Sequence, residues 1–278
     1  MSISDRAGIA GARRVVVKVG SSSISGENAG KIQPIVEALA AAHARGTEVV
    51  LVSSGAIATG MPYLALDERP VDLATQQAAA AVGQNVLIYR YQDALRPFAI
   101  VAGQVLLTAG DLENPTHRSN ARRAMERLLG LRILPIVNEN DTVATHEIRF
   151  GDNDRLAALV AALIGADALV LLSDIECLYT RPPSEPGARP IDTVAFGDDL
   201  AGFEFGSVVV NSVGTGGAAT KVSAAKLAAA EGVGVLVTSA DLVVEALEGA
   251  PIGTWFAPDP HAVPASGTGS IPVAPARG

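Results

Sequence analysis

The chain alternates between short apolar runs rich in β-branched residues and longer alanine-rich stretches, and this alternation constrains its fold more than any other feature. The apolar runs are apolar on both faces, which is typical of strands buried in a parallel sheet between layers of helices. The runs predicted as strands are residues 15–19, 48–52, 99–107, 133–137, 168–172 and 233–238. The helices predicted between them are residues 29–45, 73–96, 118–129, 154–164 and 218–231. We therefore expect an α/β fold, a three-layer αβα sandwich with a mainly parallel central sheet.

Composition indicates the size of this fold and where it ends. Hydrophobic residues make up 49% of the 278 residues, enough to bury a large core in one α/β domain over residues 1–257. Proline, glycine and serine are frequent in residues 258–278, which have little to bury, so we expect a disordered tail there. Residues 142–150 are predicted as a hairpin over a loop, and the proline-rich residues 180–190 as a surface excursion.

Charge and cysteine content exclude several classes of protein. The formal net charge is −8, with 21 basic and 29 acidic residues, so we expect no surface for nucleic acid or for an anionic membrane. Cys177 is the single cysteine, which excludes an intrachain disulfide framework and a cysteine-based zinc cluster. The chain opens without a secretory signal, and Asp167 interrupts its most apolar run, so no membrane span is predicted. These features favour a cytoplasmic protein.

Lysine is rare in this sequence, and two of its positions point to phosphate binding. The chain has seventeen arginines but only four lysines, at positions 18, 31, 221 and 226. Lys18 lies near the end of the first predicted strand, before Gly20, and Lys221 ends the glycine-rich stretch 214–221, which opens a helix. Backbone N–H groups in such turns and a flexible ammonium group suit a bound phosphate. Neither stretch is a Walker A loop or a dinucleotide-binding fingerprint, so a solvated lysine and a flexible loop stay open as alternatives.

Short polar clusters follow the other predicted strands. They are Ser53-Ser54-Gly55 after the second strand, Asn138-Glu139-Asn140-Asp141 after the fourth, Ser173-Asp174 after the fifth, and residues 150–154 before a helix. Open α/β sheets bind ligands beyond the carboxyl ends of their strands, so these clusters predict a ring of polar loops around one site. Serine, asparagine and aspartate also cap helices and form turns, and such structural roles stay open for each cluster.

These groups together favour phosphoryl transfer to an anionic acceptor. Positioning and charge neutralisation do most of the catalysis in that reaction, and no histidine or cysteine is placed as a base or a nucleophile. A carboxylate acceptor is already ionised at neutral pH and needs no base. The difficulty is then the repulsion between two anions, which ammonium groups relieve. We therefore expect a kinase that acts on a small carboxylate.

Seven stretches, in order along the chain, resemble the motifs of one family. They are residues 16–21 (VVKVGS), 52–57 (VSSGAI), 77–84 (QAAAAVGQ), 103–108 (GQVLLT), 135–143 (PIVNENDTV), 150–154 (FGDND) and 214–221 (GTGGAATK). In this combination the chain resembles the amino-acid kinase superfamily and, within it, the glutamate 5-kinases, over residues 13–257. The resemblance implies the amino-acid kinase fold and ATP-dependent phosphorylation of the γ-carboxylate of L-glutamate to γ-glutamyl 5-phosphate, the first step of proline biosynthesis.

The resemblance also implies roles for individual residues. Lys18 and Lys221 would bracket the transferring γ-phosphoryl group, and Asp154 would orient both. Glutamate would be held by Ser54, Asn138, Asp141 and Asn153, with Asp141 at its α-ammonium group. The ATP site would be lined by Lys18, Ser173, Asp174, Thr215, Gly216, Gly217, Ala218, Ala219, Thr220 and Lys221. Mg²⁺ would bridge the ATP phosphates, and no metal site built from protein ligands is expected.

Further family properties follow as expectations. We expect proline as a feedback inhibitor and a homo-oligomer, either a dimer or a tetramer. Two departures are visible: the sequence stops where many members carry a C-terminal PUA domain, and Ala218 stands where the family commonly has methionine. Three alternatives stay open, namely a sister kinase for another small substrate (N-acetylglutamate, aspartate, carbamate or a nucleoside monophosphate), a catalytically silent sensor of glutamate or proline, and a Rossmann oxidoreductase.

Overall fold

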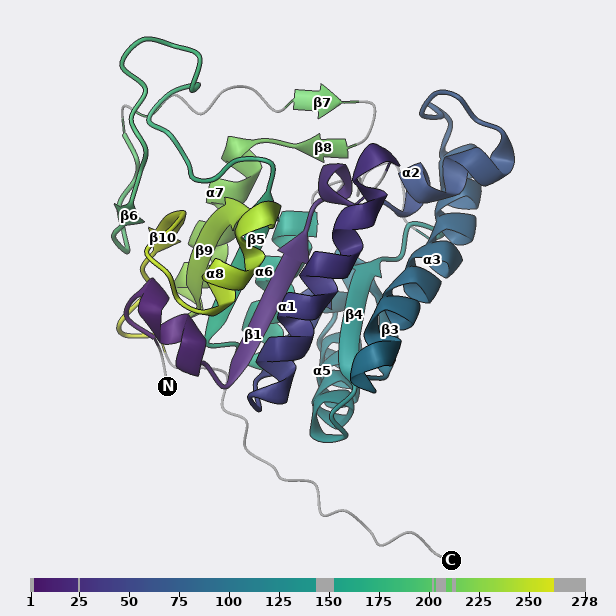
Figure 1. Cartoon of the computed structure of the whole chain (residues 1–278), viewed down its shortest axis with the longest axis horizontal. Coiled ribbons are helices and arrows are strands. Elements are labelled where there is room, and N and C mark those ends of the chain that lie inside the picture. The colour runs from purple at the N-terminus through teal and green to yellow at the C-terminus, as the bar shows by residue number, and fades with distance from the viewer. Residues whose placement is uncertain are drawn as a thin grey trace, which may run out of the picture.

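A computed structural model shows a large sheet with helices on both faces (Figure 1). It describes residues 3–24, 26–143, 153–201, 203, 209–211 and 214–262, with the backbone alone at residues 26, 27, 29, 209–211 and 214–216. The sheet has eight strands in the order β3-β4-β2-β1-β5-β9-β10-β6. Their bounds are β1 (Arg14–Val19), β2 (Glu48–Val52), β3 (Ala102–Leu107), β4 (Leu134–Glu139), β5 (Ala168–Ser173), β6 (Thr193–Val194), β9 (Gly234–Ser239) and β10 (Thr254–Phe256). A separate antiparallel pair joins β7 (Val209–Asn211) to β8 (Gly214–Gly216).

The two faces of the sheet carry separate cores because successive strand residues point to opposite sides. On one face, Val15, Val17 and Val19 of β1 share a core with α1 (Ile32–Ala44), α3 (Leu73–Leu95) and α8 (Val243–Leu247). On the other face, Val16 belongs to a core built with α5 (Pro115–Gly130), α6 (Asn153–Ile164) and α7 (Ala218–Ala230). The shorter helices are α2 (Ala56–Gly60) and α4 (Ala109–Glu113). The predicted three-layer αβα sandwich is therefore confirmed.

The strand order creates a crevice at one edge of the sheet. Strands β2, β3 and β4 lie on one side of β1, whereas β5 and β9 lie on its other side, and all of these strands are parallel. The connections from β1 and from β4 thus diverge in opposite directions. Such a switch in direction leaves room for a ligand beyond the carboxyl ends of the central strands. Lys18, Asn138 and Ser173 lie near the carboxyl ends of these strands, and Asp154 and Lys221 lie in the first turns of α6 and α7.

Helices α2 and α3 approach each other unusually closely, and two glycines permit the contact. A Cβ atom on Gly60 would lie 1.9 Å from the carbonyl oxygen of Ala79, and one on Gly83 would lie 1.8 Å from that of Ala56. Any side chain at either position would therefore force the backbones apart. The alanine-rich stretch of α3 is explained by this contact, which fixes α2 directly behind the Ser53-Ser54-Gly55 turn.

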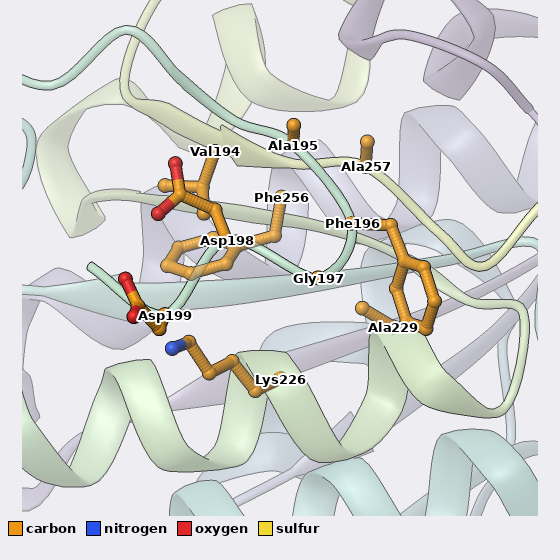
Figure 2. A pocket seen from close by; sticks show the side chains of 10 residues that line it. All are labelled: Val194, Ala195, Phe196, Gly197, Asp198, Asp199, Lys226, Ala229, Phe256 and Ala257. Atoms are coloured by element: carbon orange, nitrogen blue, oxygen red, sulfur yellow. The ribbon is translucent and has the colours of Figure 1, made fainter. Parts of the chain in front are cut away.

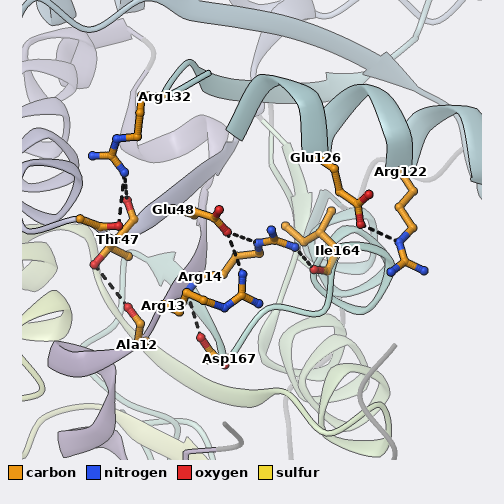
Figure 3. A network of polar contacts seen from close by, with 11 residues as sticks. Ala12, Arg13, Arg14, Thr47, Glu48, Arg122, Glu126, Arg132, Ile164 and Asp167 are labelled. Atoms are coloured by element: carbon orange, nitrogen blue, oxygen red, sulfur yellow. Dashed lines mark hydrogen bonds and ion pairs between the residues drawn. The ribbon is translucent and has the colours of Figure 1, made fainter. Parts of the chain in front are cut away.

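The opposite, amino edge of the sheet is held together by a buried arginine (Figure 3). The Nε atom of Arg14 donates to Glu48 Oε2 at 2.7 Å, and its guanidinium group also donates to the carbonyl oxygen of Ile164. The backbone N–H of Arg14 donates to Asp167 Oδ2 at 2.9 Å. This network joins the starts of β1 and β2 to the turn between α6 and β5. Arg13, which is mostly exposed, reaches the same Glu48 oxygen at 3.1 Å.

Several element boundaries differ from the sequence-based prediction. The strand predicted at 99–107 begins at Ala102, because Ala99 adopts φ 54° and closes a short 3-10 helix, Arg96–Phe98. The helix predicted at 118–129 begins at Pro115, where the Asn114 side chain accepts from two backbone N–H groups. The short strands β6 and β10 were not predicted, and β10 runs antiparallel to β9. Of the hairpin predicted at 142–150, residues 144–150 lie outside the described ranges.

The chain stays packed for a few residues beyond the expected domain boundary. Pro258 is buried, and the backbone N–H of Asp259 donates to the carbonyl oxygen of Ala229 at 2.8 Å. Residues 263–278, which make up most of the predicted tail, lie outside the described residues. No helix within the described ranges combines the length and the apolar character that a membrane crossing requires.

Candidate active site

Three charged side chains from distant parts of the sequence meet in the crevice. Lys18 projects from β1, Asp154 from the first turn of α6 and Lys221 from the first turn of α7. The Nζ atom of Lys18 lies 2.5 Å from Asp154 Oδ1, and that of Lys221 lies 3.1 Å from Asp154 Oδ2. Asp154 is completely buried, and the two lysines are 6% and 8% exposed. The two ammonium groups are thus held on either side of one carboxylate.

The charges of this trio determine its ionisation. Burial alone would raise the pKa of Asp154, but the charges of Lys18 and Lys221 and their hydrogen bonds outweigh burial and hold the pKa below its usual range. Asp154 is therefore ionised at neutral pH, and the trio has one positive charge in excess when both lysines are protonated. A buried excess charge is costly, and an anion placed between the two ammonium groups would compensate it. A phosphate group carries the negative charge that such an arrangement would take up.

A second set of groups connects the loop after β2 to α6. The side-chain nitrogen of Asn153 donates to Ser54 Oγ at 3.1 Å. Gly55 adopts φ 82°, and a Cβ atom there would lie 3.2 Å from the Cβ of Ser21, so the loops after β1 and β2 touch. The Oδ1 atom of Asn153 is buried and has no hydrogen-bond partner among the described residues. Ser54 and Asn153, two residues that the resemblance assigned to the substrate, therefore lie side by side and form one polar wall.

Asn138 lies near the end of β4, and its side-chain amide is hydrogen-bonded to its neighbours. Its Nδ2 atom donates to Gln84 Oε1 at 3.1 Å, and its Oδ1 atom accepts from the backbone N–H of Glu139 at 3.0 Å. Gln84 in turn donates to the carbonyl oxygen of Glu139 at 3.1 Å. The buried amide of Asn138 thus fixes the course of the chain after β4. Gln84 closes the motif at residues 77–84 but was given no role from the sequence, and its burial is visible only in the structure.

Asp141 is the titratable group with the most unusual position in this loop. Burial raises the pKa of Asp141 to about 6, and the positive charge of Arg69 limits the rise. Arg69 lies in the segment between α2 and α3 and was not singled out from the sequence. A half-buried carboxylate with a raised pKa gains from an added cation, because the cation favours its ionised form. Asp141 is therefore suited to an ammonium group.

The remaining candidate residues surround the first turn of α7. Ser173 ends β5, and its hydroxyl donates to Asp174 Oδ1 at 2.9 Å. Thr220 Oγ1 donates to the carbonyl oxygen of Gly217 at 2.9 Å and accepts from its N–H at 3.2 Å, which closes the helix N-terminus. Ala218 and Ala219 leave this turn without bulky side chains. For Thr215 and Gly216 in β8 only the backbone is described, and residues 150–152 lie outside the described ranges.

Comparison with protein-family models decides the family. Residues 13–239 match the model of the amino acid kinase family. The chain belongs to the amino acid kinase family. Strands β1 to β9, both lysines and Asp154 all fall inside the matched range.

Individual members of the amino acid kinase family are very similar in sequence. Over 258 residues the chain is 74% identical to a glutamate 5-kinase of Clavibacter sepedonicus, covering 93% of this chain and 99% of the relative. It is 73% identical to a glutamate 5-kinase of Leifsonia xyli over 258 residues, with 93% and 96% covered. A glutamate 5-kinase of Salinispora arenicola is 54% identical over 257 residues, but the chain covers 70% of that longer relative and 91% of its own length.

Solved structures support the same fold. A carbamate kinase from Giardia lamblia bound to AMP-PNP superposes with a TM-score of 0.67 at 17% identity, covering 90% of this chain and 100% of that one. A UMP kinase from Bacillus anthracis gives a TM-score of 0.61 at 15% identity, covering 89% and 97%. At these identities the likeness shows the fold alone.

Proposed function

We propose that this protein transfers the γ-phosphoryl group of ATP to the γ-carboxylate of L-glutamate, forming γ-glutamyl 5-phosphate for proline biosynthesis. The observation that carries the proposal is the buried trio in which Asp154 separates the ammonium groups of Lys18 and Lys221. The names of relatives that are 73–74% identical over nearly their whole length support glutamate as the acceptor. Residues 1–257 form the kinase domain in this proposal, and the protein acts in the cytoplasm.

The two lysines make the approach of two anions possible. A carboxylate oxygen of glutamate attacks the γ-phosphorus, the bond from that phosphorus to the β–γ bridging oxygen breaks, and ADP leaves. Negative charge lies on the transferring group throughout, so ammonium groups fixed in advance lower the barrier without any general base. Asp154, whose pKa is held low by the two lysines, pairs with both of them and keeps them aligned.

Glutamate is recognised at the polar wall beyond β2 and β4. Asp141 binds the α-ammonium group, because a positive partner favours the ionised form of its half-buried carboxylate. Ser54 and Asn153 bind the carboxylate oxygens, and the unpartnered Oδ1 of Asn153 accepts from the ammonium group. Asn138 acts as a positioning residue, since its amide is engaged by Gln84 and Glu139.

ATP lies over the first turn of α7. The phosphates contact Lys18, Lys221 and the turn from Thr215 to Thr220, and Ser173 and Asp174 line the same edge. Mg²⁺ would be bound by the phosphates of ATP and would supply charge neutralisation there.

We also propose a homo-oligomer that proline inhibits. Several large apolar side chains are exposed, among them Tyr89 of α3 at 65% and Val101, directly before β3, at 56%. Apolar groups gathered on one face commonly mark a protein interface. Light scattering after size exclusion will show a dimer or a tetramer, and a monomer at micromolar concentration would contradict this part. Loss of glutamate turnover on adding proline will test the inhibition.

The decisive experiment is turnover of ATP and Mg²⁺ with glutamate, N-acetylglutamate or aspartate, with the acyl phosphate trapped by hydroxylamine. We expect hydroxamate with glutamate alone. Lys221→Ala is expected to lower kcat at least about 100-fold, as for loss of a preorganised charge. Lys31→Ala is the matched control, because Lys31 is partly exposed and pairs with Asp241 and not with a residue of the trio. Hydroxamate formed only with another acid would refute glutamate as the substrate, and near-normal kcat in Lys221→Ala would refute the role of that lysine.

A further inference from the structure

A second cavity lies at the edge of the sheet opposite to the trio (Figure 2). Strand β10 is antiparallel to β9, and β6 is parallel to β10, so both of these strands end at the amino edge of the main sheet. Val194 and Phe256, their last residues, line the cavity together with Lys226 and Ala229 of α7. Its volume is about 250 Å³. At ~30 Å³ for each water molecule, this is the space of about eight waters.

The cavity is divided into an apolar part and a charged part. Val194, Phe256 and Ala229 are buried and form the floor, and the ring of Phe196, 45% exposed, covers one side. Figure 2 shows the ammonium group of Lys226 directed to the other side, where Asp199 lies. The Oδ1 atom of Asp199 accepts from the backbone N–H of Ala201 at 2.8 Å, which orients the carboxylate. Both signs of charge thus stand beside one apolar floor.

Lys226 differs from the other lysines of this lysine-poor chain. Lys18 and Lys221 pair with Asp154, and Lys31 pairs with Asp241 at 2.9 Å. Within the described part of the chain, no ion pair within 4.0 Å involves Lys226. Lys226 lies five positions after Lys221 in α7. This step is a rotation of about 140° around the helix axis, so the two ammonium groups face different sites. Lys226 has no part in the proposed phosphoryl transfer.

We propose that this cavity is a second binding site, for a small apolar L-α-amino acid. Lys226 binds the α-carboxylate, Asp199 binds the α-ammonium group, and the apolar side chain lies on Phe256 between Val194 and Ala229. A zwitterion satisfies both charges at once, through two charge-assisted hydrogen bonds. The volume suits a side chain of the size of leucine.

Other ligand classes fit the lining less well. Asp198 and Asp199 stand on the same loop and repel a phosphate or a nucleotide. A divalent cation would face the ammonium group of Lys226 and a mainly apolar wall, whereas such cations take several oxygen ligands. An uncharged apolar molecule would leave both charged groups without a partner as it displaced their water.

Calorimetric titration of the full chain with L-leucine tests the site. Saturating glutamate and AMP-PNP are present, so that any binding is outside the active site. We expect binding to wild type and at least a tenfold higher Kd for both Lys226→Met and Asp199→Asn. 3-Methylbutylamine, which lacks the carboxylate, and 4-methylpentanoate, which lacks the ammonium group, should each bind at least tenfold more weakly than leucine.

Matched variants make the result specific to this cavity. Lys31→Met removes another partly exposed lysine and should leave the Kd for leucine within twofold of wild type. The proposal is overturned if leucine does not bind wild type, or if Lys226→Met binds it as wild type does. Leucine binding that disappears once glutamate and AMP-PNP are added would place it in the active site and also overturn the proposal. Glutamate binding, titrated separately, tests the proposed function independently of the cavity.

Discussion

Replacing Asp154 by asparagine perturbs the protein at the point where its charges are most concentrated. The carboxylate lies 2.5 Å from Lys18 Nζ and 3.1 Å from Lys221 Nζ, and all three side chains are buried. Asparagine has the same shape but no charge. The variant Asp154→Asn therefore leaves two buried ammonium groups without their shared counter-ion.

The expected loss of stability follows from this arrangement. Removing one partner of a buried ion pair costs about 3–5 kcal/mol. We expect Asp154→Asn to lower the free energy of unfolding by about 4 kcal/mol.

A bound nucleotide should reverse much of this loss. Its phosphates carry the negative charge that the variant lacks, so AMP-PNP should raise the melting temperature of Asp154→Asn more than that of wild type. Turnover should still fall at least about 100-fold, because the two lysines are no longer aligned. A charge effect predicts that Asp154→Asn is less stable than wild type without nucleotide and that AMP-PNP makes this difference smaller.

Denaturant unfolding and thermal melts, each with and without AMP-PNP, measure both effects. Asp241→Asn is the control, because its ion pair with Lys31 is exposed and such pairs contribute about 0–1 kcal/mol. The reasoning is refuted if Asp154→Asn loses less than about 1 kcal/mol, or if the nucleotide stabilises it no more than it stabilises wild type.

Three further predictions address other parts of the molecule. Gly83→Ala places a Cβ 1.8 Å from the carbonyl oxygen of Ala56. We therefore expect it to lower the free energy of unfolding, measured with denaturant, by at least about 1–3 kcal/mol and to raise the KM for glutamate. Gly130→Ala is the control and should not lower the free energy of unfolding, because a Cβ at Gly130 meets no atom within 4 Å. The pKa of about 6 at Asp141 predicts that kcat/KM for glutamate falls as pH drops below 6, because protonation removes the charge that binds the ammonium group; a pH profile unchanged in Asp141→Asn would contradict this. Arg14→Met should lower the free energy of unfolding by about 3–5 kcal/mol without changing kcat, whereas Arg13→Met, at an exposed position, should lower it by at most about 1 kcal/mol. Equal losses in the two variants would disprove the stabilising role of the buried Arg14 network.

Much of the fold was accessible from sequence because its strands are uniformly apolar. The strand 48–52 was predicted with its observed bounds, and the strands around 15–19 and 168–172 within one residue at either end. Parallel strands bring their carboxyl ends to one edge, so Lys18 and the polar clusters could be placed together without coordinates. The meeting of Lys18, Asp154 and Lys221 follows from that same topology.

The missed features depend on contacts between distant segments. Strand β10 has three residues, too few for a periodic pattern, and its direction is set by pairing with β9. The contact of α2 with α3 needs Gly60 and Gly83 together, and neither glycine is distinctive alone. Arg69 lies in an irregular loop, where no periodicity predicts which side chain it will face.

The two outer strands of the sheet differ in what they can add to it. Among the described strands, β3 presents six residues with no partner on its outer side, whereas β6 has two residues and offers almost no template for another strand. Edge pairing would therefore use β3 rather than β6. Two copies joined β3 to β3 around a twofold axis would cover both long edges. The antiparallel return through β10 to β6 thus leaves one edge of the sheet that another strand could extend and one that gives it little to pair with.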